Sequence, residues 1–197
     1  MSKKRQRKTK GFASNTLRII GGDWRSRKLS FPDAPGLRPT PDRIRETLFN
    51  WLQDKILGAH CLDLFAGSGA LGLEALSRGA AEVVFVEKNP AVANQLKNNL
   101  TLLKSDAQVI QADALAFVSD EGQTSTFDLI FLDPPYRQGL LEQSLNAIQQ
   151  EKRLKDNGLL YLEHESEKNF NWSDYGLEIL KHAKAGQVSC YLLSVIK

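Results

Sequence analysis

From residue 60 onward, short apolar segments alternate with longer amphipathic ones, and this alternation constrains the fold more than any other feature of the sequence. Strands that alternate with helices form a parallel sheet covered by helices on both faces. The expected strands span 61–65, 83–87, 108–111, 129–132 and 159–163, with helices near 70–78, 90–103, 113–119 and 138–153. Two more strand-like segments, 177–180 and 188–196, predict a terminal antiparallel hairpin at one sheet edge. The sequence therefore predicts an α/β chain with a Rossmann-like, seven-stranded, mostly parallel sheet.

The residues before this sheet fall into distinct parts. Residues 1–16 contain few apolar side chains, which predicts a disordered basic tail. Residues 17–31 alternate in polarity around two adjacent glycines, which predicts a short β-hairpin, and a proline-rich connector completes the segment 17–41. Asp42 is then expected to cap a helix, and residues 42–197 form the main domain.

Positive charge is concentrated in the first quarter of the chain. Residues 1–45 carry 13 of the 26 Lys and Arg residues but only 3 of the 23 Asp and Glu residues, a balance of +10, and the remainder balances at −7. A basic segment on an acidic body predicts a polyanionic partner that this segment holds. For residues 3–10 alone, a solvated tail that aids solubility is an equally good interpretation.

The composition argues against disulfide bonds, a membrane span and a metal site. Two cysteines cannot build a disulfide framework, and no apolar run reaches the roughly 18 residues that a membrane span needs. The three histidines lack the spacing of metal ligands. We therefore expect a cytoplasmic monomer with no membrane partner and no metal site.

A glycine-rich segment follows the first predicted strand and opens a helix. Gly67, Gly69 and Gly72 form the pattern G-x-G-x-x-G, and Glu87 ends the next strand. Glycines let the chain turn tightly and let a ligand approach the backbone, while the acidic residue can hold both hydroxyls of a ribose. The pattern alone fits a nicotinamide dinucleotide or S-adenosylmethionine, because both carry an adenosine.

Four acidic residues decide between these cofactors. Each lies at or near the carboxyl end of one of the first four strands, where open α/β sheets bind ligands: Asp63, Glu87, Asp113 and Asp133. Such a rim would repel a pyrophosphate, but it suits an ammonium group, a sulfonium cation, a ribose diol and an adenine amine. The sequence therefore favours S-adenosylmethionine, although Asp113 could equally be a simple helix cap.

The segment Asp133-Pro134-Pro135-Tyr136 follows the fourth strand and is the most specific signal in the chain. Two prolines fix φ and remove two backbone donors, which leaves a rigid turn whose carbonyls can face a ligand. If the Asp133 carboxylate and the Pro134 carbonyl accept hydrogen bonds from a nucleobase amine, its nitrogen becomes more electron-rich and can attack a sulfonium methyl. Tyr136 would stack on the extruded base.

At this point the motifs resemble a known family. Asp63–Gly72 together with Asp133–Tyr136 is similar to amino-methyltransferases that act on nucleic acid. Residues 18–25 (RIIGGDWR) and 38–46 (RPTPDRIRE) narrow the resemblance to bacterial 16S rRNA guanine-N2 methyltransferases, of the small-subunit ribosomal RNA methyltransferase D type. The resemblance spans roughly residues 17–197. It implies a class I S-adenosylmethionine methyltransferase fold and methylation of the N2 amine of one guanine in 16S rRNA, within the assembled 30S subunit.

The resemblance assigns roles residue by residue. Catalysis falls to Asp133, Pro134, Pro135 and Tyr136. Cofactor binding falls to Asp63, Ala66, Gly67, Gly69, Glu87, Asp113, Ala114 and, near the methionine end, Thr40. The expected RNA contacts, taken from the basic quarter of the chain, are Arg18, Arg25, Arg27, Lys28, Arg38, Arg43 and Arg45. Ser26 departs from the family pattern W-R-G-R, which has glycine at that position, so the hairpin turn there can differ.

Other functions stay open at this stage. A DNA adenine-N6 or cytosine-N4 methyltransferase fits the D-P-P-Y turn equally well, but the chain has no room for a separate DNA-recognition domain. A catalytically idle RNA-binding assembly factor would explain the basic segment but not the intact turn. A nicotinamide oxidoreductase fits the acidic rim least.

Overall fold

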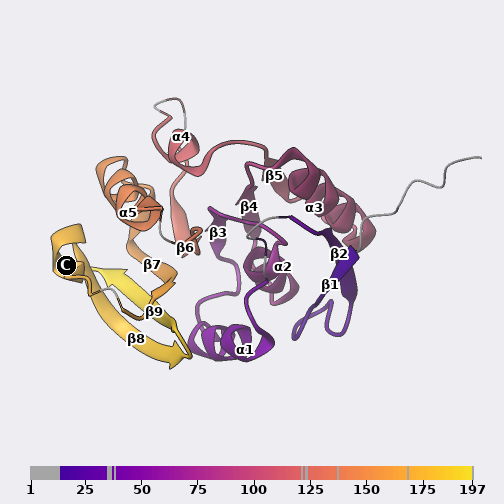
Figure 1. Ribbon diagram of the computed structural model, residues 1–197, viewed down its shortest axis with the longest axis horizontal. Helices are drawn as coiled ribbons and strands as arrows, with labels where there is room; N and C mark the ends of the chain where they lie inside the picture. The colour runs from indigo at the N-terminus through magenta and orange to yellow at the C-terminus, as the bar shows by residue number, and fades with distance from the viewer. Residues whose placement is uncertain are drawn as a thin grey trace, which may run out of the picture.

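Seven strands form the central sheet in the computed structural model, which describes residues 14–34, 37, 39–120, 122, 124–136, 138–167 and 169–196. Their order is β5-β4-β3-β6-β7-β9-β8, with β9 antiparallel to both of its neighbours and the other pairs parallel. The bounds are β3 His60–Asp63, β4 Glu82–Val86, β5 Gln108–Ile110, β6 Phe127–Leu132, β7 Leu154–Glu165, β8 Leu177–Ala185 and β9 Val188–Val195. The predicted seven-stranded α/β sheet with a terminal antiparallel hairpin is confirmed, and Figure 1 shows that hairpin at one end of the molecule.

Helices cover both faces of this sheet because its central strands are apolar on both sides. In β6, Leu129 and Phe131 join one core cluster while Ile130 and Leu132 join the other, as the alternation of side chains along a strand requires. The first cluster includes α1 (Asp42–Trp51), α2 (Ala70–Ser77) and α3 (Pro90–Leu103); the second includes α4 (Ala114–Val118), α5 (Leu140–Gln150) and the 3-10 helix η1 (Trp172–Tyr175). No helix in the described part of the chain is long and apolar enough to cross a membrane.

The predicted N-terminal hairpin forms a separate two-stranded sheet, with β1 at Ser14–Arg18 and β2 at Lys28–Pro32. It lies beside α3 (Figure 1). Its apolar side joins the first core cluster through Leu17, Ile19, Leu29 and Phe31. Strand pairing begins at Ser14, inside the segment 1–16 for which the sequence predicts a disordered tail, and the rest of that tail, residues 1–13, lies outside the described residues.

The buried carboxylate of Glu74, on α2, ties the hairpin loop to the main domain. It accepts hydrogen bonds from the backbone N–H groups of Ile20 and Gly21, at 2.9 and 2.7 Å. The Arg78 Nε donates to it at 2.8 Å, and the Arg45 Nη1 lies 3.4 Å away. The segment RIIGGDWR therefore serves at least in part to dock the hairpin on the helix that follows the glycine loop.

Two predictions for the start of α1 are wrong. Pro41, and not Asp42, occupies the N-cap position, and the Asp42 carboxylate instead pairs with Arg18 at 2.8 Å and with Arg45 at 2.6 Å. Arg45, an expected RNA contact, is only 1% exposed. Its guanidinium is held by Asp42, Glu74 and the carbonyl oxygen of Arg18. Arg45 is therefore a structural cation that cannot reach RNA.

The chain leaves the middle of the sheet in opposite directions from β3 and β6. These two strands are neighbours; β4 and β5 continue the sheet beyond β3, and β7 continues it beyond β6. Open α/β sheets bind ligands at such a switch point, outside the carboxyl ends of the strands. The loops that follow Asp63 and Leu132 flank this position, so the fold places the glycine loop and the D-P-P-Y turn together.

Candidate active site

The glycine loop after β3 is shaped by residues in the left-handed region of backbone conformation. Gly67 has a φ of 51° and Gly69, the N-cap residue of α2, has a φ of 79°. Gly72 lets α2 pack closely on the sheet, because a Cβ there would lie 2.2 Å from a ring carbon of Phe85. The three glycines therefore serve the tight turn and the close helix packing that the motif predicts.

Glu87 follows β4 and holds this loop in place. One of its carboxylate oxygens accepts the N–H of Gly67 at 2.9 Å, and the other accepts the N–H of Asn89 at 2.6 Å. Ala66, in the same loop, donates its N–H to the carbonyl oxygen of Val86 at 3.0 Å. The structure therefore brings together three residues that the sequence assigns to one cofactor site.

Asp63, at the end of β3, is a buried carboxyl group that accepts the N–H of Gly72 at 2.9 Å. Burial raises the pKa of Asp63 to about 7; the hydrogen bond from Gly72 opposes this shift and the charge of Glu87 adds to it. A ligand cation close to Asp63 would favour its ionised form.

Asp113 caps α4, so the helix-cap interpretation is correct for this structure. One of its oxygens accepts the N–H groups of Leu115 and Ala116, and the other accepts a hydrogen bond from the Lys88 Nζ at 3.0 Å. The hydrogen bond from Lys88 and those from the backbone hold the pKa of Asp113 below its ordinary value. Ala114, buried, begins the helix beside it. A cofactor role for Asp113 and Ala114 stays a prediction.

The turn Asp133–Tyr136 leaves β6 at the switch point, across from the glycine loop. Pro134 is buried, while the Tyr136 side chain is 43% exposed. Burial, followed by the charges of Glu163 and Asp63, raises the pKa of Asp133 well above its ordinary value. The turn thus presents an exposed aromatic ring beside a carboxyl group that binds a proton readily.

Glu163, on β7, is a part of this site that the sequence interpretation missed. Its side chain is 3% exposed, and its Oε1 accepts a hydrogen bond from the Tyr161 hydroxyl at 2.8 Å. Burial raises the pKa of Glu163, while hydrogen bonds from Tyr161 and Thr40 oppose the shift. Thr40, expected near the cofactor, therefore lies beside Glu163. Because Glu163 ends the fifth predicted strand, the criterion that selected the other four acidic residues would also have selected it.

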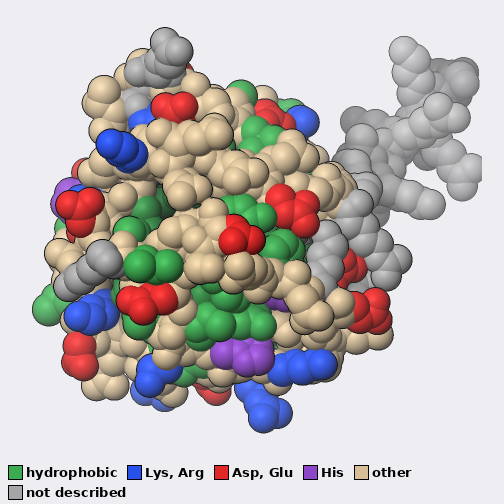
Figure 2. Space-filling model, turned by 90° about the vertical axis from the view of Figure 1, so that its left-hand side faces the viewer, with side chains coloured by type: hydrophobic (Ala, Val, Ile, Leu, Met, Phe, Trp, Pro, Cys, Tyr) green, Lys and Arg blue, Asp and Glu red, His purple; other side chains and the backbone are tan. Residues whose placement is uncertain are grey.

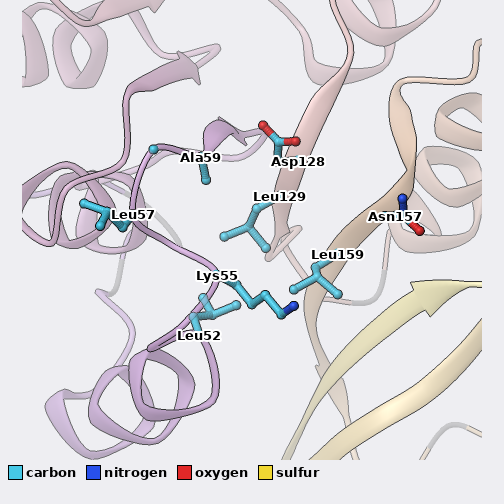
Figure 3. A pocket seen from close by; sticks show the side chains of 9 residues that line it. Leu52, Lys55, Leu57, Ala59, Asp128, Leu129, Asn157 and Leu159 are labelled. Atoms are coloured by element: carbon cyan, nitrogen blue, oxygen red, sulfur yellow. The ribbon is translucent and has the colours of Figure 1, made fainter.

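A small pocket adjoins the turn, between it and the end of β7. It is lined by Pro134, Pro135, Tyr136, Gly139, Leu140, Leu141, Glu163, His164 and Glu165. A larger hollow of about 260 Å³ lies elsewhere, where Leu52 and Lys55 approach Leu129 near the start of β6 (Figure 3). Because ligands bind at the carboxyl ends of strands in open α/β sheets, the larger hollow is not the candidate site.

The expected RNA contacts divide by exposure. Five have exposed side chains: Arg18, Arg25, Arg27, Lys28 and Arg43. Of these, Arg18 also pairs with Asp42, and the Arg27 Nη2 donates to the carbonyl oxygen of Leu102 at 3.1 Å. Arg38 lies outside the described residues. Contact of the five with RNA stays a prediction.

The end of the molecule that carries the C-terminal hairpin has a different character. Figure 2 shows hydrophobic side chains at the centre of this face, with charged side chains of both signs around them. On β8, Ile179 and Leu180 are 52% and 46% exposed. The convergence of carboxyl groups at the switch point, and not this apolar face, identifies the candidate site.

Comparisons with known proteins match this chain to a family and to solved structures. Residues 17–194 match the family described as Conserved hypothetical protein 95. The chain is 48% identical over 182 residues to the ribosomal RNA small subunit methyltransferase D of Escherichia coli, with 89% of this chain and 88% of that protein covered. A solved putative methyltransferase from E. coli superposes with a TM-score of 0.81 at 45% identity, covering 92% and 99% of the two chains.

A solved structure with lower sequence identity supports the fold only. It is a T. thermophilus 16S rRNA N2 methyltransferase solved with AdoMet and guanosine, with a TM-score of 0.66 and 23% identity. The superposition covers 93% of this chain and 50% of that one.

Proposed function

The chain belongs to the ribosomal RNA small subunit methyltransferase D family, and we propose that it transfers a methyl group from S-adenosylmethionine to the N2 amine of a guanine in 16S rRNA. The observation that carries this proposal is the D-P-P-Y turn, which stands at the switch point beside the glycine loop. The family accounts for methylation of small-subunit RNA, and the turn accounts for an amine as the methyl acceptor.

The residues around the glycine loop fit S-adenosylmethionine. Glu87 is fixed by the N–H groups of Gly67 and Asn89, so its carboxylate is held where a ribose diol would bind. Burial raises the pKa of Asp63 to about 7, and a cationic ligand nearby would stabilise the ionised form of this carboxyl group. Asp113 follows β5 at the carboxyl end of the sheet, and in this proposal it accepts a hydrogen bond from the adenine amine.

Catalysis in this site rests on positioning and on electrostatics. When bound, S-adenosylmethionine supplies a methyl group on a cationic sulfur, which keeps the bonding electron pair as the S–C bond breaks. The Asp133 carboxylate and the Pro134 carbonyl accept hydrogen bonds from the N2 amine, so that its lone pair is aimed at the methyl carbon and forms the N–C bond. The amine then loses one proton, for which the raised pKa of Asp133 makes its carboxylate a suitable acceptor. The exposed Tyr136 ring stacks on the base.

In this proposal the N-terminal hairpin binds the RNA backbone. Arg25, Arg27 and Lys28 are exposed on it, and Arg43 is exposed on the adjoining helix α1. Phosphate contacts release counterions, so the affinity for RNA should fall steeply with salt, with a slope of about −0.7 per contacted phosphate. Reversal of charge at Arg25 and Arg27 should reduce this slope by about 1 and leave the affinity for S-adenosylmethionine unchanged. An unchanged slope would place the RNA elsewhere on the protein.

The decisive experiment offers the protein labelled S-adenosylmethionine with one of three acceptors: unmodified 30S particles, naked 16S rRNA or DNA. Nucleoside analysis of the product is expected to find N2-methylguanosine in the RNA, and most of it with the 30S particles. Methylated adenine or cytosine in DNA would support the rival activity instead. No transfer to any acceptor by a protein that binds S-adenosylmethionine would support an idle assembly factor.

A further inference from the structure

Asp133 and Glu163 are neighbours across two parallel strands. Phe131 on β6 lies opposite Tyr161 on β7. Glu163 follows Tyr161 two residues later on β7, and Asp133 follows Phe131 two residues later, directly after the end of β6. Neighbouring strands lie about 4.8 Å apart. Because side chains two residues apart point to the same face of a sheet, both carboxyl groups lie on the side that buries Phe131 and Tyr161. Among charged groups, Glu163 raises the pKa of Asp133 most.

Glu163 also borders the place where the substrate base is proposed to bind. It lines the small pocket together with Pro134, Pro135 and Tyr136. Its Oε1 is fixed by the Tyr161 hydroxyl at 2.8 Å, which limits rotation of the carboxyl group away from this position. Two like charges held side by side repel each other, and a ligand that brings donors between them relieves this repulsion. The fold therefore keeps a second acceptor beside the one that the proposed reaction uses.

The bases that carry an exocyclic amine differ in the atom next to that amine. In guanine the neighbouring N1–H is a donor, whereas in adenine and cytosine the neighbouring ring nitrogen is an acceptor. Enzymes that extrude a base read this edge by hydrogen bonds. Two adjacent carboxylates match two adjacent donors, and they repel a base that presents a donor and an acceptor.

We propose that Glu163 is a specificity-determining residue, which accepts the N1–H of the target guanine while Asp133 and the Pro134 carbonyl accept the hydrogens of N2. This inference rests on the guanine-N2 reaction proposed above. It gives the protein a physical reason to reject adenine and cytosine, which the D-P-P-Y turn by itself does not supply.

A purely structural role for Glu163 leads to a different expectation. As a buried acceptor for Tyr161 and Thr40, it would influence folding and overall activity. It would not change the ratio of activities on two bases that share the N2 amine. The base preference is therefore the quantity to measure.

The test compares guanine with 2-aminopurine, which keeps the amine on C2 but has an unprotonated N1. 30S particles are reconstituted with either base at the position that the wild-type protein methylates, and kcat/KM is measured on each. The wild type should prefer guanine by about 10²-fold or more, because a site built to bind an N–H is left with an unpaired buried group by the analogue. Glu163→Gln can donate its amide N–H to the unprotonated N1, so its preference for guanine should be smaller by about tenfold or more.

Two outcomes would overturn the proposal. One is equal methylation of guanine and 2-aminopurine by the wild type; the other is the same preference in the wild type and in Glu163→Gln. A wild-type product methylated on another base or another atom would instead refute the proposed function, so the two failures can be told apart.

Two further variants control for folding and for charge. Glu178→Gln removes the same charge from the same sheet, near Ser194, which lies opposite Leu159 and away from the pocket; its base preference should equal that of the wild type. Tyr161→Phe keeps the Glu163 carboxylate but removes its hydrogen bond, and should give an intermediate preference. If Glu163→Gln does not fold, a wild-type preference in Tyr161→Phe would count against the proposal.

Discussion

The two halves of the site hold their carboxyl groups in opposite ways. On the side of β3, β4 and β5, Asp63, Glu87 and Asp113 each accept backbone N–H groups of the loops and helices that follow the strands. On the side of β6 and β7, Asp133 lies beside a second carboxyl group, Glu163, and burial together with the charge of Glu163 raises the pKa of Asp133. Backbone donors thus hold the carboxyl groups of the first half, whereas the second half brings two carboxyl groups together.

This difference assigns the halves different tasks. Acceptors that the backbone already holds are in place before a cofactor arrives, which reduces the ordering that binding requires. Carboxyl groups that lie beside each other gain when a substrate brings donors, and interactions that strengthen in the transition state raise the rate. Changes in the first half should therefore affect mainly stability and cofactor binding, and changes in the second mainly turnover.

The largest effect is expected for Glu74→Ala, on the cofactor side. The substitution leaves the buried Arg45 without its partner on α2, and removes the acceptor for the N–H groups of Ile20 and Gly21. Loss of one partner from a buried ion pair typically costs about 3–5 kcal/mol. Urea unfolding should show this loss, and Glu74→Gln, which can still accept hydrogen bonds, should lose less. A loss below about 1 kcal/mol would mean that the hairpin is anchored by other contacts.

Asp133→Ala, on the substrate side, should lower turnover without lowering stability. Removal of a preorganised polar group should lower turnover by about 10²–10³-fold. Because burial raises the pKa of Asp133 in the folded protein, ionisation of this carboxyl group costs stability, so its removal should not lower the free energy of unfolding. Single-turnover kinetics would check the first expectation, and urea unfolding would check the second. Wild-type turnover in this variant would disprove the proposed mechanism.

The next prediction uses pH to separate the halves. Burial raises the pKa of Asp63 to about 7, so the native state binds a proton that the unfolded state, with a pKa of about 3.9, has released. Stability of the free wild type should therefore fall as pH rises through this window, by about 2 kcal/mol between pH 5 and 7 from Asp63 alone. Asp63→Asn cannot titrate, so the gap between the two proteins in urea unfolding should widen over this range and stay constant above it. A gap that does not depend on pH would show that Asp63 is ionised throughout.

The cofactor half was more predictable from sequence than the substrate half, for a physical reason. Its parts are local: Gly67, Gly69 and Gly72 form one continuous pattern, and Glu87 ends the next strand. Glu163 reaches Asp133 only because β7 pairs with β6, a pairing that strand propensity does not specify. The position of Glu163 at the end of a predicted strand was therefore a usable signal, but its place beside Asp133 needed the strand order.

In the N-terminal segment, too, the sequence alone could not predict which residues are exposed. Charge correctly marks a basic quarter of the chain, but net charge cannot distinguish a cation in solvent from one in the core. Arg45 is in the core because Glu74, far along the chain on α2, lies beside it. Arg25, which pairs with no acidic side chain in the part of the chain that the structure describes, is exposed. Prediction of individual RNA contacts therefore needs the fold.

The smallest expected effect is that of Ser26→Gly, in the loop of the N-terminal hairpin. Ser26 has a φ of 68°, and its N–H donates to the carbonyl oxygen of Ile19 at 2.9 Å. The turn therefore keeps the backbone conformation that favours glycine, although this chain has serine there. A non-glycine residue in the left-handed region costs roughly 1–2 kcal/mol of stability. Glycine avoids this strain but loses about 0.5–1 kcal/mol, because its unfolded chain has more conformational entropy. Ser26→Gly should stabilise the protein by about 0.5–1 kcal/mol in urea unfolding, whereas Ser26→Ala, which keeps the strain, should not. Because the change lies in the N-terminal hairpin, outside both halves of the site, turnover should equal that of the wild type. A change in turnover would mean that the hairpin loop contributes to catalysis and not only to binding.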